Sequence, residues 1–326
     1  MSEVDAAAVI AESRAVLAEH ARTFDLAGMF LPPARRDDAA VVYAFCRLVD
    51  DAIDEAEALS AGLAALAAIE AEVRGEAPAR PLVAGLRARG AARGGAAGAG
   101  QYLCEGVRSD AGPVIVADDA ELVRYCYRVA GTVGLMMCGV MGIAEAEARP
   151  FALDLGIAMQ ITNICRDVAE DAARGRVYVP ATRLRAAGIE PEEVLAGTVG
   201  RGALAGVVED LLGLAERYYA SATRGMGFIP GRSRLAILVA SRLYRAIGRR
   251  LQRRGSDPMA GRTVVPARSK AALVAAAVGS FAARASRRRP GLEAHDPWLH
   301  RDIADLPGAD PRAAALRGQL VAVRVG

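Results

Sequence analysis

Residues 160–171 read QITNICRDVAED, a stretch that carries four polar side chains at helical spacing in an otherwise apolar segment. The polar residues follow one another at steps of three, four and four, so a helix with about 3.6 residues per turn carries them on one face. They are Gln160, Asn163, Asp167 and Asp171. Because a buried carboxylate is costly without a partner, the stripe is either a solvated face or one half of a polar site.

A second polar stripe with the same geometry lies in the segment VVYAFCRLVDDAIDE, which is otherwise mostly apolar. Steps of four, three and four separate its members, which are Tyr43, Arg47, Asp50 and Asp54. Two such stripes on the helices of one chain are hard to explain as two solvated faces. They favour a pair of buried carboxylate sites that face each other.

Four aspartates on two helices form a donor set for a hard cation. Zinc prefers His and Cys, and the histidines His20, His295 and His300 show no ligand spacing. Mg²⁺ is held by a few carboxylates together with substrate phosphates, and Mn²⁺ is the alternative ion for such a site. The stripes therefore predict a metal site that binds a diphosphate and neutralises its charge as it departs, which leaves a carbocation in an apolar cavity.

The composition indicates an all-α fold. The chain has 326 residues, of which 53% are hydrophobic and only 5% aromatic, and the abundant Ala and Leu favour helix. Alternating Val-rich runs of the kind that strands need are scarce. Helices are expected at residues 5–20, 37–59, 59–88, 119–140, 147–173, 202–224, 233–254 and 268–286, with a short helix in 187–195.

The chain is expected to form one domain, residues 1–290, followed by a loosely ordered C-terminal tail, residues 291–326. The Gly-rich stretch 89–100 is expected to be a flexible connection within that domain and not a domain boundary. The segment RGRVYVP, which follows the first stripe, is expected to form a loop that Pro180 closes.

Charge and cysteine usage bound the partners and the compartment. The net charge of +3 gives no indication of a nucleic-acid partner, and none is expected. The five cysteines are odd in number and include no CxxC pair, which is typical of a reducing cytosol. The N-terminus lacks the apolar region of a signal peptide, and the longest apolar stretch, residues 271–283, is too short to span a bilayer. We expect a cytoplasmic protein, either soluble or peripheral at a membrane.

Basic and hydrogen-bonding residues next to the stripes are candidates for phosphate binding. Arg47 and Arg166 either pair with neighbouring carboxylates or bind phosphate oxygens, and Asp167 is the obvious salt-bridge partner for Arg166. His20 and Thr23 precede the second stripe and carry groups that donate hydrogen bonds to a phosphate.

Small residues mark one helical face of the segment YCYRVAGTVGLMMCGVMG. They are Ala130, Gly131 and Gly134. Small side chains allow a long alkyl chain to lie close against a helix, and they also allow another helix to pack tightly. Both explanations stay open from the sequence.

These segments together resemble the squalene/phytoene synthase family, whose members join two isoprenoid diphosphates head to head. YAFCRLVDDAIDE is similar to the family's first aspartate-rich motif, and YCYRVAGTVG is similar to its central helix. AMQITNICRDVAEDAARGRVYVP is similar to its second aspartate-rich motif with the flap that follows. The resemblance runs from His20 to about Leu273, and GLMMCGVMG and RSRLAILVASRLYRAIGRR are most similar to bacterial phytoene synthases.

The resemblance implies a single-domain isoprenoid-synthase helical bundle with a central cavity between the two motifs. The metal ligands that it implies are Asp50, Asp54, Asn163, Asp167 and Asp171. Around the phosphates it implies roles for His20, Thr23, Tyr43, Arg47, Gln160, Arg166 and, after a small gap in the alignment, Arg262. Tyr125 and Tyr244 match tyrosines of the reaction chamber, Tyr125 with a catalytic role, and Phe24 matches an aromatic residue at the cavity mouth. The chain departs from the family at Ala21, where a serine is common.

The implied activity is the head-to-head condensation of two geranylgeranyl diphosphates to phytoene through a cyclopropyl diphosphate, without a nicotinamide cofactor. Isoprenoid diphosphates are then the substrates, and a membrane surface and a downstream desaturase are further candidate partners. Three alternatives stay open. The first is a squalene, presqualene diphosphate or dehydrosqualene synthase that uses farnesyl diphosphate. The second is a class I terpene cyclase, because DDAID fits the DDxxD pattern, although YAFCR and RGRVYVP argue against it. The third is a catalytically inactive helical binding protein.

Overall fold

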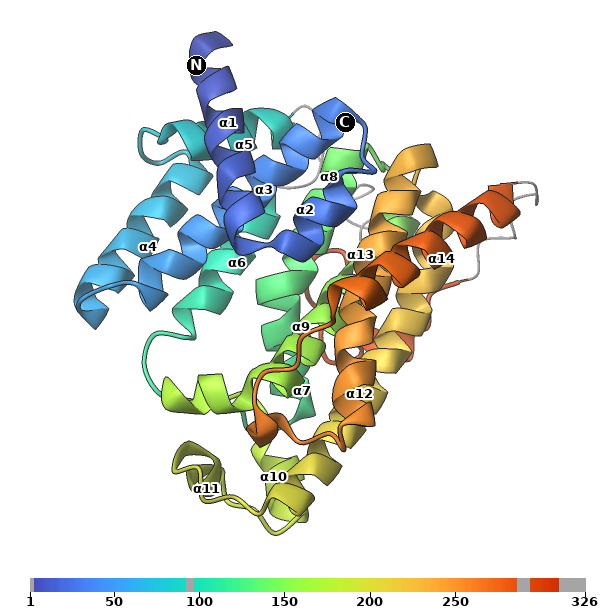
Figure 1. Cartoon of the computed structure of the whole chain (residues 1–326). Helices are drawn as coiled ribbons and strands as arrows, with labels where there is room; N and C mark the ends of the chain where they lie inside the picture. Colours follow the sequence, from blue (N-terminus) through green and yellow to red (C-terminus); the bar gives the residue numbers. More distant parts are fainter. Residues whose placement is uncertain (1–2, 92–96, 286–293, 311–326) are drawn as a thin grey trace, which may run out of the picture.

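The computed structural model describes residues 3–91, 97–285 and 294–310 of the chain. The described part is a bundle of α-helices with one very short sheet (Figure 1). The helices are α1 (Glu3–His20), α2 (Arg22–Gly28), α3 (Pro33–Asp54), α4 (Leu59–Arg74), α5 (Pro81–Ala91), α6 (Ala97–Arg108), α7 (Asp119–Cys126), α8 (Thr132–Met141), α9 (Arg149–Ala173), α10 (Ala181–Ala186), α11 (Pro191–Leu195), α12 (Arg201–Arg224), α13 (Gly231–Arg253) and α14 (Ala267–Ala285). The strands are β1 (Val114–Ile115) and β2 (Arg176–Val177).

Helix α9 is the central element of the bundle. It packs against α12 on one side, against α8 on another and against α13 on a third (Figure 1). Its apolar residues Leu153, Ile157 and Ile161 are completely buried. A helix that is apolar over most of its surface needs neighbours all around it, and this explains why the first stripe lies deep in the bundle.

Local signals in the sequence explain several helix ends. Pro33 opens α3, where its missing N–H costs no hydrogen bond. Asp118 caps α7, because its carboxylate accepts a hydrogen bond from the backbone N–H of Glu121 over 3.0 Å. Gly142 ends α8 with a φ of +68°, a left-handed conformation that favours glycine.

The structure departs from the expected helix pattern at several places. The predicted helix 59–88 is two helices, because Gly75 adopts a φ of +80° and ends α4, and α5 starts only at Pro81. The short helices α2, α6 and α10 lie where the sequence analysis expected no helix. Part of the Gly-rich stretch 89–100 belongs to α5 and α6, and its residues 92–96 lie outside the described part.

The predicted helix 119–140 is interrupted by a wide, π-helical turn, Tyr127–Gly131, between α7 and α8. A turn of this kind accommodates one extra residue without ending the helix. The backbone N–H of Thr132 bonds to the carbonyl of Tyr127, five residues earlier, so the helix axis continues into α8.

The predicted loop 174–180 pairs with the segment before α7. Strands β1 and β2 run parallel, with Val114 opposite Arg176 and Ile115 opposite Val177. The N–H of Val116 also donates to the carbonyl of Val177 over 3.0 Å. The pairing holds the loop after α9 against the segment that precedes α7. Within the described residues, β1 and β2 form the only sheet.

Residues 294–310, which belong to the expected tail 291–326, pack against the bundle. The hydroxyl of Tyr127 donates to the carbonyl of Pro307 over 2.9 Å, and the hydroxyl of Tyr218 on α12 donates to the carbonyl of Leu299 over 2.8 Å. Residues 291–293 and 311–326 of the tail lie outside the described part. Among the helices described, we find none with the length and apolar character needed to cross a bilayer.

Candidate active site

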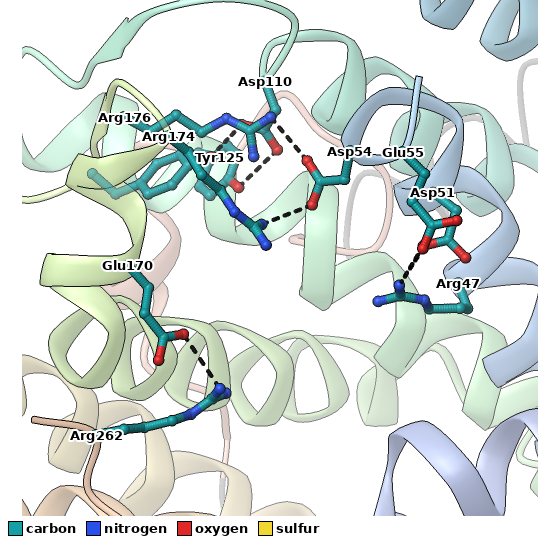
Figure 2. A network of polar contacts seen from close by, with 11 residues as sticks. Arg47, Asp51, Asp54, Glu55, Asp110, Tyr125, Glu170, Arg174, Arg176 and Arg262 are labelled. Atoms are coloured by element: carbon teal, nitrogen blue, oxygen red, sulfur yellow. Dashed lines mark hydrogen bonds and ion pairs between the residues drawn. The ribbon is translucent and has the colours of Figure 1, made fainter. Parts of the chain in front are cut away.

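The two aspartate stripes lie at the C-terminal parts of α3 and α9 and are linked by the loop after α9. Arg174 and Arg176 of this loop both bond Asp54 on α3, at 3.0 Å and 2.9 Å (Figure 2). The charges of the same two guanidinium groups act on Asp171 of α9. Asp54 and Asp171, which are 117 positions apart in the sequence, therefore share one local environment.

Burial and mutual repulsion leave these carboxylates short of positive charge. Burial raises the pKa of Asp50 from 3.8 to about 7, and the nearby Asp54 and Asp110 add to the effect. Burial and then the charge of Asp167 raise the pKa of Asp171 to about 7 as well. A group of carboxylates that resists ionisation is one whose negative charge a bound dication would stabilise.

The amide of Asn163 lies one turn before Asp167 on α9. Its Nδ2 donates to Gln160 Oε1 over 3.4 Å. Its Oδ1 is buried and finds no hydrogen-bond partner among the residues that the structure describes. A buried carbonyl oxygen without a partner costs free energy, so Asn163 has an unused acceptor beside the carboxylates. The donors are all oxygen atoms, and such a set fits a hard divalent cation such as Mg²⁺ or Mn²⁺.

The arginines of the two stripes are engaged with carboxylates in this structure. Arg47 bonds Asp51 at 2.6 Å and Glu55 at 3.2 Å, so its guanidinium group turns to the neighbours of Asp50 (Figure 2). These contacts leave the Arg47 side chain about one-third exposed, at the rim of the site.

Two further arginines meet at Asp167. The Nε atom of Arg166 donates to Asp167 Oδ1 over 2.7 Å, and its Nη2 atom bonds the other carboxylate oxygen. Arg262, which reaches α9 from the segment before α14, lies 3.6 Å from Asp167 and 3.3 Å from Glu170 (Figure 2 shows the second contact). In this structure Arg166 therefore forms a salt bridge with Asp167. Arg262 also lies next to the aspartate stripe of α9.

Sequence reasoning missed Asp110, which lies between the two stripes. It accepts hydrogen bonds from the hydroxyls of Tyr125, over 3.0 Å, and Tyr178, over 2.6 Å. The two tyrosine rings stack with centroids 4.7 Å apart. Burial raises the pKa of Asp110 to about 6 against these hydrogen bonds and the charge of Arg176. Asp110 stands in the loop SDAGP, where an aspartate normally indicates a turn, so no periodicity could have revealed it.

An apolar cavity of about 300 Å³ extends from the polar site along α9. One face of α9 lines it at steps of one and three, namely Phe151, Ala152, Leu155, Gly156, Met159, Gln160 and Asn163, and Ala148 just before the helix also lines it. Its polar end is lined by Phe24, Tyr43 and Tyr244, and the rings of Phe24 and Tyr244 stack at 5.0 Å. Tyr125, which the resemblance assigned to the reaction chamber, points to Asp110 instead.

The small residues of the central helix serve mainly for tight helix packing. A Cβ atom on Gly134 of α8 would lie 2.3 Å from the carbonyl oxygen of Ala152 on α9. A Cβ atom on Gly156 would lie equally close, at 2.3 Å, to the carbonyl oxygen of Ala130. The two helices therefore cross with their backbones in contact. Ala130 and Gly134 also line the cavity, so both explanations of the sequence pattern hold at this crossing.

His20 and Thr23 lie at the edge of the site. His20 ends α1 with its side chain 39% exposed, and its Nε2 atom is 3.9 Å from the carboxylate of Glu19. Its charge acts on Asp51, which places it near the Arg47 side of the site. Thr23 is half-buried on α2. Neither residue contacts the four aspartates of the stripes in this structure.

The family model described as squalene/phytoene synthase matches residues 17–269 of the chain. The chain belongs to the squalene/phytoene synthase family. The match contains both aspartate stripes, the π-helical turn and Arg262, so it covers every candidate site residue of the sequence analysis.

Curated members of the squalene/phytoene synthase family cover most of the chain. A phytoene synthase of Thermus thermophilus is 40% identical over 271 residues, which are 79% of this chain and 89% of that protein. A 15-cis-phytoene synthase of Paracoccus sp. is 35% identical over 259 residues, which are 76% of this chain and 84% of that protein. The predicted family is confirmed. The prediction of a prenyltransferase similar to phytoene synthases is confirmed as well.

Solved structures of the family share the fold. A dehydrosqualene synthase superposes with a TM-score of 0.76 at 25% identity and covers 85% of this chain and 98% of its own. A squalene synthase from Alicyclobacillus acidocaldarius superposes with a TM-score of 0.69 at 27% identity and covers 79% of this chain and 98% of its own. The predicted all-α isoprenoid-synthase fold is confirmed.

The raised pKa values of Asp50 and Asp171 predict how metal binding depends on pH. Each carboxyl binds a proton more tightly in the folded protein, so the metal-free protein loses stability as the pH rises from about 4 through 7. Between pH 6 and pH 8 we expect a loss on the order of 1 kcal/mol for each carboxyl. Mg²⁺ should therefore raise the thermal midpoint more at pH 8 than at pH 6, as differential scanning fluorimetry can measure.

The matched control for this pH dependence is the double variant Asp50→Asn, Asp171→Asn. It removes the two titrating carboxyls and retains their volume, so its metal-free midpoint should change less between pH 6 and pH 8. An equal Mg²⁺ shift at both pH values, or an unchanged slope in the double variant, would contradict the assignment.

Proposed function

We propose that the chain condenses two molecules of geranylgeranyl diphosphate head to head to phytoene, with release of two diphosphates. The observation that carries the proposal is a group of partly buried carboxylates from α3 and α9 beside the polar end of an apolar cavity. The carboxylate end suits a diphosphate with its metal ions, and the cavity suits a hydrocarbon chain. The names of the phytoene synthases of Thermus thermophilus and Paracoccus sp. support phytoene as the product.

Mg²⁺ or Mn²⁺, when bound at this site, would neutralise the charge that develops on a leaving diphosphate. The residues that we propose as their ligands are Asp50, Asp54, Asn163, Asp167 and Asp171. The unpartnered Oδ1 of Asn163 and the raised pKa values of Asp50 and Asp171 support this assignment. All five residues offer oxygen donors, which hard dications prefer.

Guanidinium groups around the carboxylates are proposed to receive the diphosphates. Arg174 and Arg176 now neutralise Asp54, and Arg166 and Arg262 now neutralise Asp167. The planar forks of these arginines match phosphate oxygens two at a time, so the same side chains could bind a diphosphate. Further proposed contacts with the diphosphates come from the rim and the cavity mouth, namely His20, Thr23, Tyr43, Arg47 and Gln160.

The cavity itself positions two prenyl chains and excludes water. The first donor loses diphosphate, its allylic cation alkylates a double bond of the second molecule, and loss of a proton closes a cyclopropyl diphosphate. This intermediate ionises in turn, rearranges and loses a proton to give the C40 polyene. The aromatic faces of Phe24, Tyr43 and Tyr244 lie at the polar end of the cavity, where they can stabilise the cations. We propose a catalytic role for Tyr125 together with Asp110, which accepts a hydrogen bond from the Tyr125 hydroxyl.

Two related functions are candidates, and they differ in the chain length of the substrate. The lining of α9 runs from Phe151 to Asn163, which corresponds to roughly 18 Å along the helix. The preference for a C20 donor rests on the phytoene synthase relatives. The second candidate is a presqualene diphosphate, squalene or dehydrosqualene synthase with a C15 donor, which the likeness to the dehydrosqualene synthase structure favours. Substrates and products are lipids in both cases, so we propose peripheral contact with a membrane in the cytoplasm and delivery of the polyene to a desaturase.

The experiment that tests the proposal is a product analysis with purified protein and Mg²⁺. Separate incubations receive geranylgeranyl or farnesyl diphosphate, each with and without NADPH, and the extracted lipids are separated by chromatography. We expect a C40 product with a conjugated triene chromophore from the C20 donor, independent of NADPH, because the last step loses a proton and needs no hydride. Turnover of the C15 donor alone would establish the second candidate, and absence of product from both donors would contradict head-to-head condensation.

A further inference from the structure

A cluster of one carboxylate and two imidazoles lies on α9, away from the aspartate-rich site. Asp154 is 13 residues before Asp167, which corresponds to about 20 Å along the helix. Its side chain is 0% exposed. His295 Nε2 lies 2.9 Å from one carboxylate oxygen, and His300 Nε2 lies 2.8 Å from the other. One atom from each residue can be chosen so that all three lie within 4.8 Å of one another.

The ring of His300 is held in the orientation that a metal ligand requires. Its Nδ1 atom lies 2.9 Å from the carbonyl oxygen of Ala309. A carbonyl only accepts hydrogen bonds, so Nδ1 carries the hydrogen, and in the neutral ring Nε2 is the nitrogen with the free electron pair. Metal-bound histidines commonly donate their second ring N–H to a carbonyl in this way.

The ring of His295 is fixed by packing. It meets Phe151 of α9 edge to face, with centroids 5.2 Å apart, and its centroid is 4.3 Å from that of His300. Only 6% of the His295 side chain is exposed, and 3% of the His300 side chain. The three donor groups thus converge in an almost fully buried position.

The contact between His300 and Asp154 needs a positive charge. A neutral His300 directs the electron pair of Nε2 at a carboxylate, and both groups are then acceptors. A proton on Nε2 satisfies this contact, and His295 satisfies its own contact as the tautomer that carries hydrogen on Nε2. A dication between the three groups satisfies both contacts as well, with the two imidazoles and the carboxylate as its ligands, at a position that water reaches poorly.

We propose that Asp154, His295 and His300 bind a transition-metal dication of the zinc class. Two imidazole nitrogens and one carboxylate form a donor set that binds Zn²⁺ and Co²⁺ in preference to Mg²⁺. The aspartate-rich site differs, because its donors are all oxygen atoms. The second carboxylate oxygen or a water completes the coordination. The bound ion fastens residues 294–310 to α9 behind Phe151, a residue that lines the cavity.

Cobalt binding to the full-length, untagged protein tests the proposal directly. The protein is stripped with a chelator and titrated with Co²⁺ in excess Mg²⁺, which occupies the all-oxygen site. We expect one equivalent of Co²⁺ with the strong visible absorption of a four- or five-coordinate ion that has nitrogen ligands. His295→Gln and His300→Gln should each weaken binding at least about 100-fold, since the loss of a ligand exceeds the loss of a supporting contact.

Two control variants separate this site from the rest of the chain. Asp302→Asn changes a carboxylate of the same segment that lies outside the cluster, and Asp167→Ala changes the aspartate-rich site. Both should retain the cobalt spectrum. Zn²⁺ should also raise the thermal midpoint of the unmodified protein and of both controls, and of neither histidine variant. If His300→Gln does not fold, His295→Gln, at the less buried position, carries the test.

Two results would overturn the proposal. One is a weak cobalt spectrum of the six-coordinate, all-oxygen type that disappears in Asp167→Ala. The other is equal affinity for Co²⁺ in the unmodified protein and in His295→Gln. Since neither measurement depends on turnover, failure here is distinguishable from failure of the proposed condensation.

Discussion

Replacement of Asp167 by alanine is expected to reduce kcat by at least about 1000-fold while the protein remains folded. The variant removes a proposed metal ligand, and metal ions contribute several kcal/mol of charge stabilisation to a departing phosphate group. Each 1.4 kcal/mol corresponds to about tenfold in rate. The measurement is steady-state release of diphosphate at saturating substrate and Mg²⁺, with circular dichroism and thermal unfolding as checks of the fold.

The Asp167→Ala result needs two comparisons, because Arg166 and Arg262 both contact this carboxylate. Asp167→Asn retains an oxygen for Arg166 and removes the charge, so it should be nearly as inactive with a smaller loss of stability. Glu170→Gln removes a half-exposed carboxylate from the same helix and should retain activity within a few-fold. A near-normal rate for Asp167→Ala would refute the metal-ligand assignment.

Replacement of Gly156 by alanine is expected to destabilise the fold by about 3 kcal/mol, because it overpacks a helix crossing. The added Cβ would lie 2.3 Å from the carbonyl oxygen of Ala130, and backbone atoms cannot turn aside as a flexible side chain can. The helices α8 and α9 must separate, although their contact forms one wall of the cavity. Chemical denaturation, monitored by circular dichroism, measures the loss.

The matched control is Gly206→Ala on α12. Gly206 lies at an exposed helical position where an added Cβ meets nothing within 4 Å. Alanine reduces the entropy of the unfolded chain, so this variant should gain about 0.5 kcal/mol of stability. Equal behaviour of the two variants would show that the backbone contact at Gly156 is not tight in solution.

The helices and both aspartate stripes could be predicted from the sequence because periodicity determines them. Asp167 and Asp171 share a face whatever surrounds α9, and the apolar residues between them require burial. The break at Gly75 was readable in the sequence, because Gly75 is followed by Pro78 and Pro81 in the segment VRGEAPARP, and a glycine with prolines after it is an ordinary signal for a helix end.

The rest of the site depends on contacts between distant segments, which spacing does not encode. Asp110 reaches the stripes from a loop, and Arg176 reaches Asp54 because β2 pairs with β1. His295 and His300 show no ligand spacing with each other, and they converge because Asp154 on α9 lies between them. Arg176 lies 122 positions from Asp54, and His295 and His300 lie 141 and 146 positions from Asp154.

The π-helical turn Tyr127–Gly131 changes the phase of the helix that contains it. In a regular helix, Tyr125 and Val129 would lie on one face, four residues apart. The extra residue rotates the two halves against each other by about 100°. The half before the turn directs Tyr125 to Asp110, whereas Val129 within the turn and Val133 after it line the cavity. One continuous helix thus contributes side chains both to the carboxylate site and to the apolar cavity. Deletion of a single residue from this turn would direct the side chains of both halves to the same side of the helix.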